Sequence, residues 1–325
     1  MSTASGVPRR AKARAGTSSS RELAWTKRGL VLTVPDHLAW ARTHAALPIV
    51  TPLTGSRVRL YFSSRDARNR AQIGRAQVDL DNRSSVPAFD AEPVVRFGPP
   101  GAFDDCGATG GCIVVRDREQ FLYYSGWSLA VEVPFLFFIG CAVSSDGGET
   151  FTKTSASPVL GRTSLDPFLT ASPSVLIEGG TWRMWYVSST GWTASPKPEP
   201  NYRICYAESS DGIEWKPTGR VCIDYSYPGE HAIARPHVIK DGSVYRMWFS
   251  HRGDRYRIGY AESNDGLEWV RKDDEAGIDV SDSGWDSEML AYPWVGDVAG
   301  KRRMLYNGNS YGMTGIGEAV DSISG

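Results

Sequence analysis

The sequence predicts an all-β protein, a five-bladed β-propeller, because one short apolar phrase returns five times along the chain. The phrase reads RLYFSS from Arg59 and recurs as FLYYSG, RMWYVS, RMWFSH and RMLYNG. Intervals of 62, 62, 63 and 57 residues separate its central positions, which are Tyr61, Tyr123, Trp185, Trp248 and Leu305. A fixed period of this length is typical of a repeat architecture. Apolar residues at consecutive positions indicate strands buried on both faces, as in sheets stacked around an axis.

A second strand follows each phrase after a short gap. In three repeats this strand leads into a polar Asp-Gly turn, which reads SSDGGETF, SSDGIEW and SNDGLEW. Glycine supplies the positive φ that such turns need. The first of these turns matches the Asp box of sialidase-type propellers, and the other two are shortened forms. We therefore expect Asp146, Asp211 and Asp265 to brace turns and to take no part in chemistry.

A third strand precedes each phrase. Four repeats carry a Pro-x-Val motif there, in LPIV, SPSV, RPHV and YPWV, and the second repeat has TGGCIV from Thr109 instead. Proline is tolerated in a strand mainly at its start or on an edge. This strand is therefore predicted to be the innermost strand of each blade and to begin near the central channel.

The two ends of the repeat region predict how the ring closes. The last repeat stops at Val320, soon after its third strand, and GLVLTV from Gly29 to Val34 precedes the first repeat as an isolated strand. We expect this strand to complete the last blade, since closure removes open sheet edges. Residues 23–325 are then one propeller domain, and residues 1–22 are predicted to be a disordered basic tail.

Composition argues against several classes of function. The formal net charge of -1 gives no electrostatic reason to expect nucleic acid or membrane partners. The N-terminal segment lacks the apolar core of a secretory signal, and no stretch has the length of a membrane span. The five cysteines form no CxxC pair, which favours free thiols. We expect a cytoplasmic protein without a cofactor. The sequence leaves open whether the channel holds a structural divalent cation and which oligomeric state the protein has.

Acidic residues recur in the short loop before the innermost strand in four of the five repeats. They are Asp104, Asp105, Asp166, Glu230, Asp286 and Glu288. If the repeats superpose, these groups converge on one mouth of the channel. Converging carboxylates repel each other and lose solvent, which raises at least one pKa, as a general acid requires. Glycoside hydrolysis is the reaction that most directly uses two such acids. The alternative is that these acids cap turns or pair with Arg235 and its neighbours.

The first repeat differs, because Arg42 and His44 stand in this loop where the other repeats have acids. We expect Arg235, His237 and His44 to bind sugar hydroxyls or a negatively charged group.

The loops after the repeated phrases carry groups that suit a sugar. A sugar ring needs an aromatic face to stack on and forked donors for its hydroxyls. The candidates are Arg65, Asp66, Trp127, Trp192, His251, Arg252, Asn309 and Tyr311. Ordinary blade packing is the alternative, and it is favoured for Trp185 and Trp248, which lie inside the strand.

Several motifs together resemble the five-bladed glycoside hydrolase superfamily. They are YFSSRD, FDDCG, YAESSDGIEW, ARPHV, YAESNDGLEW, GWDSEMLAYP and YNGNSYG. That superfamily includes families 43, 32, 62, 68, 117 and 130, and the chain resembles more closely a mostly uncharacterised bacterial glycosidase-like group. The resemblance covers about Trp25 to Val320. It implies an Asp in the first blade, an Asp in the second and a Glu in the third. The second-blade acid is present, whereas the first blade has His44 and the third has Asp166.

We therefore predict a glycoside hydrolase that acts on a glycan or small glycoside. Glu230 is predicted to be the general acid and Asp105 the base or nucleophile, with Glu288 or Asp286 as a third carboxylate. Two alternatives stay open. One is a glycoside phosphorylase that holds inorganic phosphate with basic residues, including Arg42 and Arg252. The other is a carbohydrate-binding propeller without turnover, since fold does not imply function.

Overall fold

The computed structural model describes residues 23–321, and nearly every element in this range is a β-strand. The helical elements among these residues are a short 3-10 helix, η1 (Asp273–Glu275), and a single turn, α1 (Asn309–Gly312). The tail predicted for residues 1–22 lies outside the described residues.

The strands form three hydrogen-bonded sheets, one of four strands and two of eight. Each eight-stranded sheet consists of two antiparallel groups joined by one parallel pairing, β4 with β6 and β12 with β14, and we number the resulting five groups in chain order. Group 1 contains β2 (Thr43–Pro52), β3 (Arg57–Arg65), β4 (Ala71–Asp79) and β5 (Ala88–Phe89). Group 2 contains β6 (Gly107–Arg116), β7 (Glu119–Ser128), β8 (Leu136–Ser144) and β9 (Thr152–Lys153). Group 3 contains β10 (Thr170–Glu178), β11 (Thr181–Trp192), β12 (Pro200–Ser209) and β13 (Lys216–Ile223).

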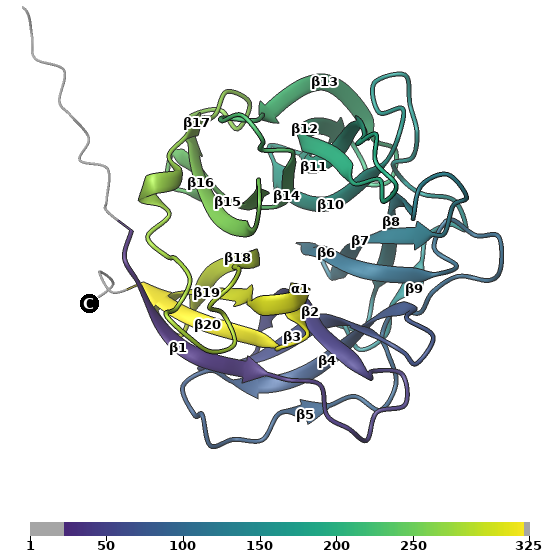
Figure 1. Cartoon of the computed structure of the whole chain (residues 1–325). Coiled ribbons are helices and arrows are strands. Elements are labelled where there is room, and N and C mark those ends of the chain that lie inside the picture. The colour runs from purple at the N-terminus through teal and green to yellow at the C-terminus, as the bar shows by residue number, and fades with distance from the viewer. Residues whose placement is uncertain (1–22, 322–325) are drawn as a thin grey trace, which may run out of the picture.

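Group 4 contains β14 (Ala232–Asp241), β15 (Val244–Arg252), β16 (Tyr256–Ser263) and β17 (Val270–Arg271). Group 5 contains β18 (Ala291–Val298), β19 (Lys301–Asn307), β20 (Ile316–Asp321) and the N-terminal strand β1 (Trp25–Leu32). Figure 1 shows the groups arranged around a common centre, with the first strand of each group toward it. Neighbouring first strands contact each other, and β18 contacts β2.

The N-terminal strand pairs with the last strand of the chain. Trp25 lies opposite Asp321 and Leu32 opposite Ile316, in antiparallel register. The strand begins earlier than the predicted Gly29 and ends before Val34. Apolar side chains of group 5, Leu305 and Ile316, share one buried cluster with Val58 and Leu60 of group 1. The first and last parts of the fold are therefore in direct contact.

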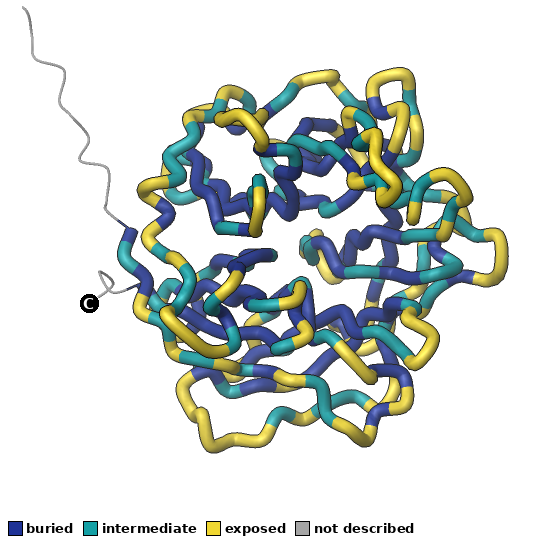
Figure 2. The backbone as a smooth tube through the Cα atoms, in the orientation of Figure 1, coloured by how far each residue is buried: buried dark blue, intermediate teal, exposed yellow. Residues whose placement is uncertain are grey.

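The repeated phrase forms the second strand of each group and is buried, as predicted. Tyr61, Tyr123, Trp185, Trp248 and Leu305 are all 0% exposed. Figure 2 shows buried backbone at the centre of the molecule and exposed backbone in the peripheral loops. Each phrase packs at the boundary with a neighbouring group, as where the Trp185 ring meets Trp269 edge-on at 6.2 Å. The phrase is thus a packing element.

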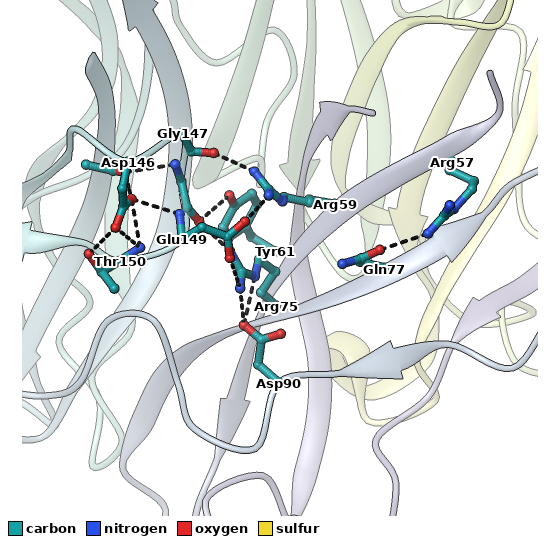
Figure 3. A network of polar contacts seen from close by, with 12 residues as sticks. Arg57, Arg59, Tyr61, Arg75, Gln77, Asp90, Asp146, Gly147, Glu149 and Thr150 are labelled. Atoms are coloured by element: carbon teal, nitrogen blue, oxygen red, sulfur yellow. Dashed lines mark hydrogen bonds and ion pairs between the residues drawn. The ribbon is translucent and has the colours of Figure 1, made fainter. Parts of the chain in front are cut away.

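The Asp-Gly turns are braced by their aspartates, which confirms the prediction. Asp146 accepts hydrogen bonds from the backbone of Glu149 and from both the backbone and the hydroxyl of Thr150 (Figure 3). These bonds, the one from the Thr150 hydroxyl above all, lower the pKa of Asp146. Asp211 and Asp265 likewise accept from backbone amides two and three residues further on.

The same turns join neighbouring groups. The Tyr61 hydroxyl of group 1 donates to the carbonyl of Gly148 in group 2 at 3.3 Å, and Arg59 and Arg75 both pair with Glu149 (Figure 3). Between groups 2 and 3, the Tyr123 hydroxyl donates to the Gly212 carbonyl at 2.6 Å. The aromatic residue of one phrase is therefore hydrogen-bonded to the turn of the next group.

Each innermost strand is irregular at the Pro-x-Val motif. The residue before the proline has a positive φ in four groups, with values of 56° at Leu47, 49° at Ser172, 51° at Arg235 and 59° at Tyr292. Gly110 has the corresponding place in group 2. The strand register shifts at this point in all five groups. We call these five residues the bulge positions, and four of them line the central cavity described below.

The backbone N–H at a bulge position is bound by the preceding group. Serine hydroxyls accept it at Gly110 (Ser63, 2.9 Å), Ser172 (Ser125, 2.8 Å) and Tyr292 (Ser250, 2.8 Å). At Leu47 the acceptor is the Oδ1 atom of Asn307 at 2.9 Å. Group 3 has Val187 in the corresponding place, which offers no acceptor. These bonds hold the innermost strands in a fixed relation to one another.

Candidate functional site

A central cavity of about 160 Å³ opens where the innermost strands meet. Residues from all five groups line it, including the bulge positions Leu47, Gly110, Ser172 and Tyr292. A cavity of about 150 Å³ can hold one benzene-sized ring. The central cavity therefore has room for about one six-membered ring.

Aromatic side chains form much of the wall of this cavity. Phe135 and Phe137 line one part, with ring centroids 5.0 Å apart, and Trp192 supports Phe135 at 5.4 Å. Tyr202 and Tyr256 line another part, and their hydroxyls lie 2.9 Å apart. The wall thus combines flat apolar faces with phenolic hydroxyls, a combination that suits the apolar face and the hydroxyls of a sugar ring.

Arg65 stands between the central cavity and a smaller one of about 60 Å³, and it lines both. His44, Ser63, Thr109, Tyr292 and Tyr311 also line the smaller cavity. The Arg65 guanidinium donates to the neutral Oδ1 atom of Asn69 at 2.9 Å. Burial first, and then the charge of Arg65, lower the pKa of His44 to about 4. The two predicted ligand-binding residues, Arg65 and His44, are thus brought together.

Arg252 differs from Arg65 because it has a carboxylate partner. Its guanidinium donates to Glu199 at 2.7 Å and lies 5.2 Å over the ring of Tyr256. His231 also contacts Glu199, at 3.3 Å. The charge of Arg252 is therefore balanced beside the wall of the central cavity.

Arg235 and His237, both predicted to bind a ligand, contact backbone carbonyls. The Arg235 guanidinium is 1% exposed and donates to the carbonyls of Gly110 and Pro48 at 3.0 Å each, and also to that of Gly111. Burial lowers its pKa to about 10. His237 contacts the Val295 carbonyl at 2.7 Å, and burial lowers its pKa to about 4. Both side chains tie innermost strands together.

The predicted catalytic acids lie within separate groups and do not line either of these cavities. Three aspartates repeat one arrangement, in which a buried carboxylate accepts from the tyrosine hydroxyl of its own group. The pairs are Asp104 with Tyr124 (3.0 Å), Asp166 with Tyr186 (3.0 Å) and Asp286 with Tyr306 (2.9 Å). Lys153 also donates to Asp104, and Lys27 to Asp286, at 2.5 and 2.8 Å. These three aspartates do occupy equivalent positions in their groups, but their hydrogen bonds are made inside the sheets.

Glu230 follows a variant of this arrangement, because group 4 has Phe249 in place of the tyrosine. Its carboxylate accepts from Arg271 twice at 2.9 Å, from His251 at 2.9 Å and from the Ser226 backbone at 2.7 Å. Burial by itself would raise the pKa of Glu230, but the hydrogen bonds from His251 and Arg271 outweigh it and lower the pKa to about 2. The raised pKa expected for a general acid is therefore not found at Glu230.

The remaining predicted acids lie in surface loops. Asp105 accepts from the Gly101 backbone at 3.0 Å, and its other oxygen is buried without a hydrogen-bond partner among the described residues. Glu288 is exposed and lies 3.6 Å from Arg255. Asp66 accepts from Arg70 and from two backbone amides of its own turn, so it braces that turn.

Four other predicted binding residues have varied surroundings. Trp127 packs 6.3 Å from Phe137, and Tyr311 lines the smaller cavity. The Oδ1 atom of Asn309 accepts from the Glu288 backbone at 2.7 Å. Arg42 is exposed and donates to the Asp36 carbonyl at 3.3 Å.

Sequence reasoning did not identify the residues that form most of the cavity wall. Ser172 and Tyr292 directly precede the proline of the repeated motif, so their common position was available as a signal. Phe137, Tyr202 and Tyr256 each directly precede the motif of the strand after the phrase, which reads FIGCA, RICYA and RIGYA, so their common position was also available as a signal. The sequence does not show, however, that their side chains reach a cavity.

Within residues 23–321, no three His, Cys, Asp or Glu side chains are grouped so as to hold a metal ion. In the same range, no helix is long and apolar enough to cross a membrane.

Comparisons with known proteins add relatives by sequence and by structure. No family model matches this sequence. Two proteins from different strains of Mycobacterium tuberculosis, the uncharacterized proteins Rv1502 and MT1551, are each 45% identical over 298 residues. Each match covers 92% of this chain and 99% of the relative.

Solved structures of similar shape are glycoside hydrolases. One described as a glycoside hydrolase has a TM-score of 0.70 at 16% identity, covering 92% of this chain and 91% of that chain. A thermostable family-43 glycoside hydrolase has a TM-score of 0.61 at 17% identity, covering 89% and 91%. A glycosyl hydrolase from Bacteroides ovatus has a TM-score of 0.66 at 15% identity, covering 92% and 93%. The TM-scores show a shared β-propeller fold, and at these low identities the likeness shows the fold alone.

Proposed function

Because this chain belongs to the same family as Rv1502 of Mycobacterium tuberculosis and has the fold of the propeller glycoside hydrolases, we propose that it binds a carbohydrate in its central cavity. The ligand is a glycan or small glycoside, of which one sugar ring enters the cavity.

We further infer that the five strand groups are the five blades of a closed ring. The pairing of β1 with β20 supports this inference, and so does the bond between Asn307 and the Leu47 backbone, which joins the last group to the first. The buried cluster that Leu305 and Val58 share adds apolar contact at the same boundary. In a closed ring the central cavity is lined by residues of all five groups.

The observation that carries the proposal is the chemical character of the central cavity. Its described lining presents phenylalanine rings, tyrosine hydroxyls, Ser172, Thr109 and one arginine. Carbohydrates are bound through stacking on aromatic faces and through hydrogen bonds to hydroxyls. None of the described residues that line the cavity carries a carboxylate, so the lining supports binding more directly than two-carboxylate hydrolysis.

Hydrolysis of the bound glycoside is a second candidate, and the likeness to glycoside hydrolases favours it. A further observation in its favour is the buried oxygen of Asp105 that has no hydrogen-bond partner among the described residues. In this candidate Asp105 and Glu230 act on the glycosidic bond, and Glu230 is ionised at neutral pH because its pKa is lowered.

The binding proposal is tested by filling the cavity. Ser172 shares its backbone conformation with Arg235 and Tyr292, which carry large side chains at φ values of 51° and 59°. The substitution Ser172→Tyr therefore suits the backbone and occupies the cavity. A panel of aryl glycosides and free monosaccharides, screened by saturation-transfer NMR, should bind to the wild type and not to this variant. Ser157→Tyr, at an exposed position, is the control.

If sugars bind equally to the wild type and to Ser172→Tyr, the cavity is not the binding site. Hydrolysis is measured on the same panel by release of the aryl group. Turnover that disappears in Asp105→Asn and Glu230→Gln supports the second candidate, whereas binding without turnover in the wild type excludes it for those glycosides.

A further inference from the structure

We propose that Arg65 binds a negatively charged group of the carbohydrate, so that the ligand is an acidic sugar carrying a carboxylate or a phosphate. This inference rests on the proposed carbohydrate binding and names the class of ligand. It follows from the partners of Arg65, from its surroundings and from its place between two cavities.

Arg65 lacks the partners that other half-buried or buried arginines near the centre have. Arg252 donates to Glu199, Arg271 to Glu230, and Arg235 to three backbone carbonyls. Within residues 23–321, no carboxylate lies within 4.0 Å of the Arg65 guanidinium, and its recorded side-chain hydrogen bond goes to the neutral amide of Asn69. Partial burial lowers the pKa of Arg65, so its charged form is less well stabilised than in water. An anion would supply the missing stabilisation.

The neighbours of Arg65 favour an anion. The residues that line the smaller cavity include four with hydroxyls, Ser63, Thr109, Tyr292 and Tyr311. The Thr109 hydroxyl already donates to the Ser125 carbonyl at 3.1 Å, and the other three can donate hydrogen bonds. The imidazole of His44 adds a further group that can donate from one ring nitrogen. None of the described residues lining this cavity is acidic. A cluster of donors around one cation, without a competing carboxylate, suits a carboxylate or phosphate.

The arrangement of the two cavities indicates how one ligand uses both. They share Leu47, Arg65, Thr109 and Tyr292 as lining residues, so they meet at Arg65. The central cavity has room for about one ring. The smaller cavity of about 60 Å³ has room for a small substituent, since a water molecule takes about 30 Å³ in the liquid. A sugar ring in the first cavity therefore places a charged substituent beside Arg65.

The test uses matched sets of ligands that differ in charge. Each set contains a neutral hexose, the corresponding hexuronic acid and the corresponding hexose 6-phosphate, titrated by calorimetry into the full chain. We expect at least one acidic member to bind more tightly than its neutral counterpart, by on the order of tenfold to hundredfold, because a hydrogen bond to a charged group is worth about 1.5–3 kcal/mol. The uronic acid and phosphate arms identify which anion is preferred.

The variant Arg65→Gln should abolish this preference, so that the acidic sugar binds no more tightly than the neutral hexose binds to the same variant. Arg65→Lys, which keeps the charge but loses the forked donors, should retain part of it. Arg68→Gln removes a charge from the same turn at an exposed position and should leave binding unchanged. Equal binding of neutral and acidic sugars by the wild type would overturn the inference and leave the proposed function intact.

A separate arm uses inorganic phosphate alone, followed through the NMR signals of the arginine side chains. If no sugar binds but phosphate perturbs Arg65 in the wild type, the anion site stands and carbohydrate binding fails. If neither sugars nor phosphate bind, both proposals are contradicted.

Discussion

Tyr186 donates a hydrogen bond to the buried carboxylate of Asp166, and the same pairing recurs at Tyr124 and Tyr306. We predict that Tyr186→Phe lowers the free energy of unfolding by roughly 1–3 kcal/mol, because a buried carboxylate oxygen loses its partner. Urea denaturation measures the change, and Tyr225→Phe, at an exposed position, is the control. Equal stabilities would show that these tyrosines do not support the acids, and would reopen a catalytic role for Asp166.

The buried imidazole of His237 predicts a loss of stability in acid. Burial lowers its pKa from 6.5 to about 4, so the folded protein binds fewer protons than the unfolded chain between these values. Neutral His237 therefore leaves the free energy of unfolding undiminished above about pH 6.5, and this stability is lost as the pH falls toward 4. His237→Gln keeps a donor for the Val295 carbonyl but does not titrate. Between about pH 7 and about pH 4.5 the variant should lose on the order of 2–3 kcal/mol less stability than the wild type. If the wild type and the variant lose the same stability over this pH range, His237 is not a buried neutral imidazole.

At the scale of elements, Asn307 of β19 joins group 5 to group 1. Its side chain accepts from the Leu47 backbone at 2.9 Å and donates to the Ala45 and Gly315 carbonyls at 2.8 and 2.7 Å. We predict that Asn307→Leu costs roughly 2–4 kcal/mol of unfolding free energy, because it leaves these buried groups without partners. Asn307→Ser introduces the serine hydroxyl found at three of the other boundaries and should cost less. If both variants are as stable as the wild type in chemical denaturation, this bond does not hold the two groups together.

The strands were largely predictable from the sequence because each phrase carries its own packing signal. Consecutive apolar residues mark the second strand, Asp-Gly marks the turn, and proline marks the first strand. The short outer strands β5, β9 and β17, two residues each, carry no comparable pattern. They are defined by pairing with a neighbour and not by local preference.

The candidate site was less predictable, because the position of a residue in the repeat does not show which way its side chain points. Three of the acids, Asp104, Asp166 and Asp286, turn toward tyrosines inside the sheets, and Glu230 turns toward Arg271 and His251. The sequence shows both Asp166 and Tyr186, but not that they are 3.0 Å apart. His44 and Arg65 were both predicted to bind a ligand and do line one cavity, since they belong to the paired strands β2 and β3.

For the whole molecule, the arrangement of charge is as informative as the fold. Near the centre the described carboxylates are paired, as Glu199 is with Arg252 and Glu230 with Arg271, and the cavity where all groups meet is lined by aromatic rings, hydroxyls and Arg65. Among the described residues that line this cavity, Arg65 is the cationic side chain. This lining, which has no carboxylate, is the basis of our proposal that the protein binds a sugar although it does not bring two carboxylates together there.

The most direct test is a crystal structure of the protein with the acidic sugar that binds most tightly in the titrations. The account predicts one sugar ring in the central cavity against Phe137 and Tyr256, with its carboxylate or phosphate at Arg65. A ligand bound elsewhere, with its anomeric carbon between Asp105 and Glu230, would contradict the account.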